Sequence, residues 1–198
     1  MMEFIFASNN SAKTAEMTIL AEKMGHRVIN YRDVLGRELK FPAETTDSQV
    51  ENARIKANFV HQYLPDCWVL ADDTGLYLQA FPNRFGVTSS REFKDLGVLG
   101  TEAEIAYIQS LYHSEEDRSA YLLAVLALCT PAGQMFLAEG RGGVRIAEEA
   151  HSGPYIGGLD DIMEAENGKT LSEMSLDEVV AYHDRSRALK NIIEQIQL

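Results

Sequence analysis

The first third of the chain carries short apolar runs that alternate with segments in which apolar residues recur at helical spacing. The runs with the length and composition of buried strands are 4–7, 27–31 and 68–71. Helical spacing is found over 17–24 and again over 48–63. Each of these two segments is followed by a residue typical of a helix end, Gly25 and Pro65. The pattern predicts the element order β-α-β-α-β.

The rest of the chain is rich in strands first and in helices afterwards. Residues 118–130 form a long apolar run, and a turn signal at 131–134 indicates that 135–138 pairs back as a hairpin. The glycine-rich segment 139–143 is expected to interrupt this second strand as a bulge. A helix is expected over 101–113, and the end of the chain is expected to be helical. These elements predict an α/β protein with a mixed, twisted β-sheet flanked by helices.

Composition limits the size and the partners of this protein. Its 198 residues are enough for a single domain, expected to span 1–198 in two lobes. The formal net charge of −12 repels polyanions, so neither a nucleic-acid duplex nor an anionic membrane is expected as a partner. A small anion is compatible with this charge if a few cations converge on it and a metal ion assists.

Cysteine usage and the N-terminus indicate a cytoplasmic protein. Cys67 and Cys129 stand in apolar runs without metal-ligand spacing, so we expect buried, reduced thiols. The N-terminus has no basic segment of the kind that opens a signal peptide, and no apolar run approaches the length of a membrane span. We therefore expect a cytoplasmic location and no membrane partner.

Two adjacent acids, Asp72 and Asp73, follow the apolar run at 68–71 directly. Carboxylates at the end of a buried strand are well placed to hold a metal ion, and Gly75 would let the chain turn sharply after them. The same residue types are also typical of a turn that merely caps a strand. This stretch alone leaves both interpretations open.

The segment 8–13, Ser-Asn-Asn-Ser-Ala-Lys, links the first predicted strand to the first predicted helix. Backbone N–H groups and the positive end of the helix dipole suit phosphate oxygens at such a place, and Lys13 adds a full charge. Ordinary capping of the helix by Asn or Ser explains the same residues, and the segment has no glycine. Taken alone, the loop favours the capping interpretation.

Five blocks of sequence, in order along nearly the whole chain, resemble motifs of the inosine triphosphate pyrophosphatase family. The blocks are 8–13, 44–57 (Glu-Thr, then Glu-Asn-Ala and Lys-Ala), 71–76 (Ala-Asp-Asp-Thr-Gly-Leu), 86–91 (Gly-Val-Thr-Ser-Ser-Arg) and 168–174 (Gly-Lys-Thr-Leu-Ser-Glu-Met). In the first block Ala12 stands where the family usually has glycine. The number and order of the blocks make the resemblance specific.

The resemblance implies Mg²⁺-dependent hydrolysis of non-standard purine nucleoside triphosphates (ITP, dITP, XTP) to the monophosphate and pyrophosphate. It also implies a nucleotide cleft between two lobes and a homodimer. Glu44 and Asp73 would hold Mg²⁺, and Asp73 would also be the catalytic residue that orients or deprotonates the attacking water. The residues implied in substrate binding are Ser8, Asn9, Asn10, Ser11, Ala12, Lys13, Lys56, Thr74, Gly158, Asp160 and Arg185.

The segment that would select the base departs from the family pattern. The family has Gly-Phe-Gly-Tyr-Asp-Pro, and this chain has Gly157, Leu159 and Asp161 in place of the Phe, the Tyr and the Pro. The family's closing Ser-His-Arg is His-Asp-Arg at 183–185, so the histidine before Arg185 is lost. Loss of an aromatic platform removes about 1–3 kcal/mol of base stacking. Loss of a donor that reads the purine carbonyl weakens discrimination against amino purines.

Two nearby rings are candidates to replace the missing groups. His183 either substitutes for the missing imidazole or is a solvent-exposed histidine at a helix end. Tyr155 either stacks on a base or is a packed loop residue, and the second interpretation is favoured. These departures leave two other functions open: hydrolysis of a modified or pyrimidine nucleotide, and nucleotide binding without turnover.

Overall fold

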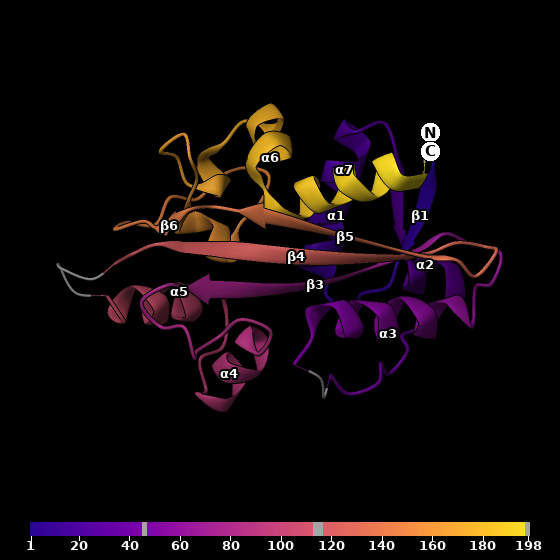
Figure 1. Ribbon diagram of the computed structural model, residues 1–198, viewed down its shortest axis with the longest axis horizontal. Helices are drawn as coiled ribbons and strands as arrows, with labels where there is room; N and C mark the ends of the chain where they lie inside the picture. Colours follow the sequence, from indigo (N-terminus) through magenta and orange to yellow (C-terminus); the bar gives the residue numbers. More distant parts are fainter. Residues whose placement is uncertain (45–46, 113–116, 197–198) are drawn as a thin grey trace. The chain divides into compact units, whose positions relative to one another are not determined.

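The structure is a computed structural model that describes residues 1–44, 47–112 and 117–196 (Figure 1). The strands are β1 (Glu3–Phe6), β2 (Arg27–Asn30), β3 (Val69–Leu78), β4 (Ala120–Cys129), β5 (Met135–Gly142), β6 (Arg145–Ile146) and β7 (Met163–Glu164). The helices are α1 (Ser11–Lys23), α2 (Tyr31–Leu35), α3 (Gln49–His61), α4 (Ser89–Asp95), α5 (Thr101–Ser110), α6 (Leu176–Tyr182) and α7 (Asp184–Ile196), with 3-10 turns η1 (Gly158–Asp161) and η2 (Leu171–Glu173). Among the described residues, no helix combines the length and the apolar character that a membrane span needs.

The main sheet has five strands in the order β2-β1-β3-β4-β5. Strand β1 pairs in parallel with β2 and with β3. Strands β4 and β5 are neighbours joined by a short turn in which Thr130 N donates to Gln134 O, a connection that only antiparallel strands allow. The sheet is therefore mixed, and the α/β fold class expected from the sequence is confirmed.

The chain forms two compact units, and the boundary between them falls within β3, β4 and β5. Unit 1 comprises residues 1–73, 124–140 and 185–198, and unit 2 comprises residues 74–123 and 141–184. This division agrees with the expectation of two lobes. The nucleotide cleft and the single functional domain 1–198 stay predictions.

The core of unit 1 lies between the sheet and the helices α1 and α7. Alternate residues of the strands, such as Phe4, Phe6 and Leu70, are buried in one cluster with Met17 of α1 and Ile192 of α7. Because side chains alternate along a strand, the intervening residues face the other side of the sheet. This alternation decides where the acids of β3 point.

Strand β3 does not end at the paired acids. It runs without interruption from Val69 to Leu78, and Gly75 is buried within it, so the turn expected after Asp72 and Asp73 is wrong. The acids are tolerated inside a strand because basic side chains neutralise them, as described below. A local pattern of apolar and acidic residues could not show those distant partners.

Three other expectations are corrected by the structure. Tyr31 begins the short helix α2, capped by Asn30, and does not extend the strand before it. Strand β5 continues through the glycine-rich segment 139–142, because exposed Glu139 and Arg141 alternate with buried glycines in the usual strand pattern. Helix α4 has no counterpart among the elements expected from the sequence.

The expected thiols and helix ends are mostly found. Cys129 is buried as expected, whereas Cys67 is half-buried, and both are free thiols. The helix expected over 101–113 is present as α5 and ends at Ser110, and His113 lies outside the described residues. Its N-cap is Gly100.

Candidate active site

The loop before α1 is an organised helix N-terminus in unit 1. The Asn10 side chain caps the helix by accepting from Lys13 N at 3.1 Å, and Asn10 N donates to Ser8 Oγ at 3.1 Å. The capping interpretation is therefore confirmed. It does not exclude phosphate binding, because Asn9, Asn10, Ser11 and Ala12 are all exposed at this end of the helix. Of the N–H groups expected to bind phosphate, that of Asn10 is already used within the loop.

Two buried residues fix this loop from the end of β2. Asn30 Nδ2 donates to Ser8 O at 2.9 Å and to Thr14 Oγ1 at 2.7 Å. The hydroxyl of Tyr31 hydrogen-bonds Asn9 Oδ1 and accepts from Leu39 N at 2.9 Å. Neither Asn30 nor Tyr31 was recognised from the sequence. The only signal available was an asparagine at the carboxyl end of a strand parallel to β1.

Asp72 holds together two of the cations that were expected to bind substrate. Its Oδ2 accepts from Lys13 Nζ and from Arg185 Nε, each at 3.1 Å. Arg185 also donates to Glu16 Oε1 at 2.7 Å. Burial alone would raise the pKa of the Asp72 carboxyl, but the charges of Lys13 and Arg185 outweigh burial and hold that pKa well below its usual range. Asp72 is therefore ionised at neutral pH, and its carboxylate positions Lys13 and Arg185.

Asp73 is held by one face of α3. Its Oδ2 accepts from Asn52 Nδ2 at 3.2 Å and its Oδ1 from Lys56 Nζ at 3.1 Å. Gln49 Nε2 donates to the backbone carbonyl of Asp73 at 3.2 Å. Residues three and four apart share a helix face, which explains why these side chains of α3 converge. Gln49 and Asn52 were not recognised as site residues, although Asn52 lies one turn before Lys56.

The electrostatics of Asp73 differ from those of its neighbour. Burial is the largest influence and raises the pKa of the Asp73 carboxyl, and the nearby Glu44 carboxylate raises it further. The Lys56 ammonium and the Asn52 hydrogen bond lower this pKa, but they do not offset the rise. A carboxyl with a raised pKa is a stronger base, as the removal of a proton from water requires.

Glu44 shares Lys56 with Asp73. Lys56 Nζ donates to Glu44 Oε1 at 2.9 Å, and the Glu44 side chain is 40% exposed. The two carboxylates expected to bind Mg²⁺ thus converge on a single cation position. Mg²⁺ prefers one or two carboxylates and keeps several waters, so a partly open pair of this kind fits it.

The carboxylates of Asp72 and Asp73 have different partners. Side chains of adjacent strand residues point to opposite faces of a sheet, and Asp72 accordingly contacts Lys13 of α1 whereas Asp73 contacts Lys56 of α3. The interpretation of these neighbours as joint metal ligands is wrong in this respect. Asp72 instead accepts a hydrogen bond from Lys13, and Asp73 accepts one from Lys56.

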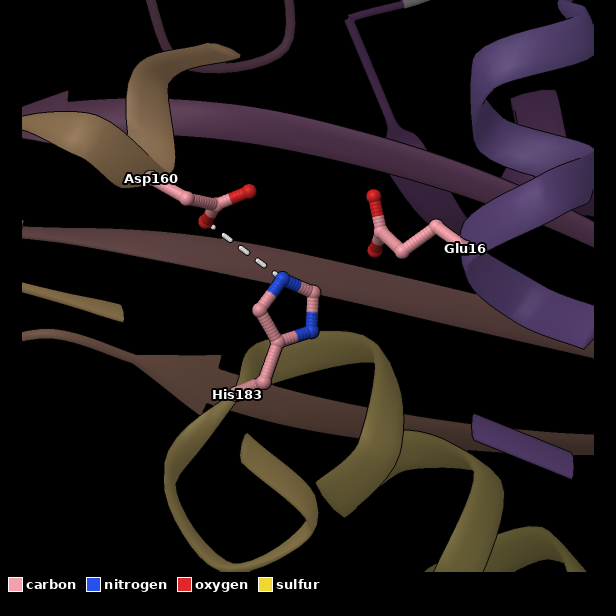
Figure 2. A group of neighbouring side chains, drawn as sticks. All are labelled: Glu16, Asp160 and His183. Atoms are coloured by element: carbon pink, nitrogen blue, oxygen red, sulfur yellow. Dashed lines mark ion pairs between the residues drawn. The ribbon is translucent and has the colours of Figure 1, made fainter. Parts of the chain in front are cut away.

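In unit 2, Gly158 and Asp160 form part of the turn η1. Gly158 has φ +85°, a conformation that favours glycine, and Asp160 is buried. His183 Nε2 lies 3.4 Å from Asp160 Oδ1 and 3.3 Å from Asp184 Oδ1, and Figure 2 shows the imidazole turned toward Asp160. Asp160 and His183 are also of the types that bind metal ions. His183 is 0% exposed, so the solvent-exposed interpretation of this histidine is wrong.

Three other residues of unit 2 bear on the expectations for base selection. Asp161, which stands at the family's proline, accepts from Ser172 Oγ at 2.5 Å and from Ser152 Oγ at 2.9 Å. The aspartate that replaces proline thus links the turn η1 to Ser152 and Ser172 by hydrogen bonds. Tyr155 is 39% exposed, so it is not a packed loop residue. Thr74 is half-buried in β3.

The fold and the site together define an α/β protein in which carboxylates of the central strand β3 lie beside lysines of α1 and α3. Such an arrangement suits a small polyanion and a hard cation. The chain belongs to the Ham1 family, whose family model matches residues 4–195. The family membership confirms the resemblance seen in the sequence.

Relatives and a solved structure align along almost the whole chain. A dihydroneopterin triphosphate diphosphatase from Limosilactobacillus reuteri is 31% identical, with 98% of this chain and 97% of the relative covered. A dITP/XTP pyrophosphatase from Thermus thermophilus is also 31% identical, over 98% of this chain and 91% of the relative. The structure of a HAM1 protein from Coxiella burnetii has a TM-score of 0.76 at 28% identity, and 100% of this chain and 99% of that chain are covered.

Proposed function

We propose that this chain hydrolyses the bond between the α and β phosphates of non-standard purine nucleoside triphosphates (ITP, dITP and XTP), which gives the nucleoside monophosphate and pyrophosphate. The observation that carries the proposal is the convergence of Asp73, Glu44 and Lys56 on the face of β3 that packs against α3. A buried carboxyl with a raised pKa beside a second carboxylate and a lysine suits metal-assisted attack by water on a polyphosphate.

The chemistry requires charge neutralisation more than covalent catalysis. Glu44 and Asp73 would hold Mg²⁺, which when bound supplies a positive charge for the phosphate oxygens. Asp73 would orient the attacking water and accept its proton. Lys13 and Lys56 would neutralise the triphosphate, with help from the exposed N-terminus of α1.

The other expected substrate-binding residues remain part of the proposal. Ser8, Asn9, Asn10, Ser11 and Ala12 would surround the phosphates. Thr74, Gly158, Asp160 and Arg185 would contact the rest of the substrate. The burial of Arg185 and its bonds to Asp72 and Glu16 also give it a structural role. The imidazole of His183 is proposed to replace the missing family histidine, because it is buried and faces Asp160.

The names of the relatives support the type of reaction more strongly than they support one particular base in the substrate. The Thermus thermophilus relative is named for dITP and XTP, and so is a relative from Streptococcus pneumoniae at 29% identity. The shared name describes removal of pyrophosphate from a purine triphosphate. The carboxylates of β3 and the lysines of α1 and α3 are of the types that such a reaction would use.

A second candidate substrate is dihydroneopterin triphosphate. The relative that carries this substrate in its name is as similar as the Thermus thermophilus relative. The base-selecting segment of this chain also has Gly157 and Leu159 in place of the family's two rings, so recognition of a purine by stacking is weakened. A pterin carries the same triphosphate, so the proposed phosphate and metal residues would act unchanged.

Pyrophosphate release from a panel of triphosphates distinguishes the candidates. The panel contains ITP, dITP, XTP, dihydroneopterin triphosphate, the four common nucleoside triphosphates and dUTP, each with Mg²⁺. We expect kcat/KM for ITP, dITP or XTP to exceed that for the common nucleotides by about 100-fold. This is less than the roughly 10⁴-fold of a site that hydrogen-bonds the distinguishing group fully, because the family histidine before Arg185 is lost. Preference for dihydroneopterin triphosphate or dUTP would change the assigned substrate, but the assigned reaction, release of pyrophosphate, would stand. Binding of nucleotide with no turnover would favour the non-catalytic alternative.

Several further properties belong to the same proposal. We propose Mg²⁺ as the metal, a homodimer as the assembly and the cytoplasm as the location, with neither nucleic acid nor a membrane as a partner. The carboxylate pair supports the metal, and the net charge of −12 supports the exclusion of polyanions. Size-exclusion chromatography with light scattering tests the dimer.

A further inference from the structure

Lys56 is bonded to both of the carboxylates that are proposed to hold Mg²⁺. Its Nζ lies 2.9 Å from Glu44 Oε1 and 3.1 Å from Asp73 Oδ1. Both distances lie in the range of N–H···O hydrogen bonds, so the ammonium stands where the two carboxylates converge. A divalent ion bound by Glu44 and Asp73 would need the same oxygens.

The position of Lys56 is built into the fold. The side chain is only 14% exposed. It comes from the face of α3 whose Asn52 and Gln49 also donate hydrogen bonds to Asp73. Asn52 occupies the second oxygen of Asp73, which leaves Oδ1 to Lys56. The position of Lys56 on α3 therefore directs its ammonium toward the two carboxylates.

The local charges keep Lys56 protonated at this place. Lysine is cationic at neutral pH, and the carboxylates of Glu44 and Asp73, 2.9 Å and 3.1 Å from Lys56 Nζ, favour this charged form. A second cation placed beside a protonated Lys56 would be repelled. The ammonium and a divalent ion thus compete for one pair of carboxylates.

We propose that Lys56 is the resident cation of the Glu44–Asp73 pair: in the nucleotide-free protein its ammonium holds the metal position and leaves it only for the oxygens of a bound triphosphate. The inference rests on the proposed function, because the triphosphate is the group that draws Lys56 away. Lys56 then couples metal binding to substrate binding, and this coupling is reciprocal. The protein holds the metal firmly only when substrate is present.

Binding of Mn²⁺ to the nucleotide-free protein tests this role. Mn²⁺ accepts the same oxygen ligands as Mg²⁺, and its free concentration is read from its electron paramagnetic resonance signal. We expect Lys56→Met to bind Mn²⁺ about tenfold tighter than the unaltered protein, a common size of coupling between two ligands. Lys56→Gln, which keeps a neutral hydrogen-bond donor for the two carboxylates, is expected to show the same gain and guards against misfolding of the Met variant.

Two controls show whether Mn²⁺ affinity depends on where a positive charge is removed or only on the net charge of the protein. Lys40→Met removes the same charge from an exposed lysine of unit 1 and is expected to leave Mn²⁺ affinity unchanged. Lys56→Met combined with Asp73→Asn is expected to lose the gain, because one of the two carboxylates is neutral.

The outcomes distinguish failure of this inference from failure of the proposed function. Equal Mn²⁺ affinity in the unaltered protein and in both folded Lys56 variants would overturn the role of Lys56, while pyrophosphate release by the unaltered protein would leave the function standing. An equal gain in Lys40→Met would also overturn it. Absence of both Mn²⁺ binding and pyrophosphate release from every folded protein would overturn the proposed function as well.

Discussion

Replacement of Asp73 by asparagine is expected to lower kcat/KM for pyrophosphate release by about a thousandfold, the middle of the range for loss of a positioned general base. The asparagine keeps the size of the side chain and the hydrogen bond to Lys56, but it cannot accept a proton from water. It also removes one of the two carboxylates proposed for Mg²⁺. Steady-state assay of pyrophosphate with ITP and XTP measures the effect.

The matched control for this change is Asp66→Asn. Asp66 is exposed in the turn after α3, so its replacement removes the same charge without touching β3. The control is expected to retain full activity, and circular dichroism should show that both variants are folded. Retention of activity by folded Asp73→Asn would contradict the assignment of Asp73 as the catalytic residue.

Replacement of Asp72 by asparagine is expected to lower the free energy of unfolding by about 3 kcal/mol at pH 7, because it removes one partner from a buried ion-paired group. The Asp72 side chain is 2% exposed and bridges Lys13 to Arg185. Arg185 keeps Glu16 as a partner, whereas Lys13 loses the carboxylate that holds it. Urea unfolding of this variant, with Asp66→Asn as the control, measures the loss. A loss below about 1 kcal/mol would mean that Asp72 does not anchor these cations.

The same variant should change the dependence of stability on pH. The pKa of Asp72 is depressed in the folded protein by Lys13 and Arg185, so its contribution is present above the unfolded-state pKa and is lost as the pH falls toward the folded-state value. The unaltered protein should therefore lose stability from about pH 5 downward, and Asp72→Asn should lose less over the same range. Parallel curves for the two proteins would contradict the depressed pKa.

Secondary-structure elements that depend on residues close in sequence are predicted well. The strand β1, the helices α1 and α3 and the β4–β5 hairpin follow from local periodicity and turn residues, and the structure contains all of them. The grouping of Asp73 with Glu44 and Lys56 came from the family resemblance. Periodicity alone does not bring residues from a loop, a helix and a strand to one point.

Features that depend on distant partners were not predictable from the sequence. The acids inside β3 are stable there because Lys13, Lys56 and Arg185 reach them, and Arg185 is 113 residues away from Asp72. Buried His183 likewise lies beside Asp160, a residue of the separate turn η1. A sequence pattern shows which groups need a partner, but it does not show which residue supplies it.

Identification of the products formed with Mg²⁺ tests the central claim most directly. ITP, XTP and dihydroneopterin triphosphate are each incubated with the protein and with Asp73→Asn, and the products are separated by ion-exchange chromatography. Equal amounts of monophosphate and pyrophosphate are expected from at least one of these compounds, formed about a thousandfold more slowly by the variant. Formation of the diphosphate and orthophosphate, or no conversion of any triphosphate by the folded protein, would contradict it.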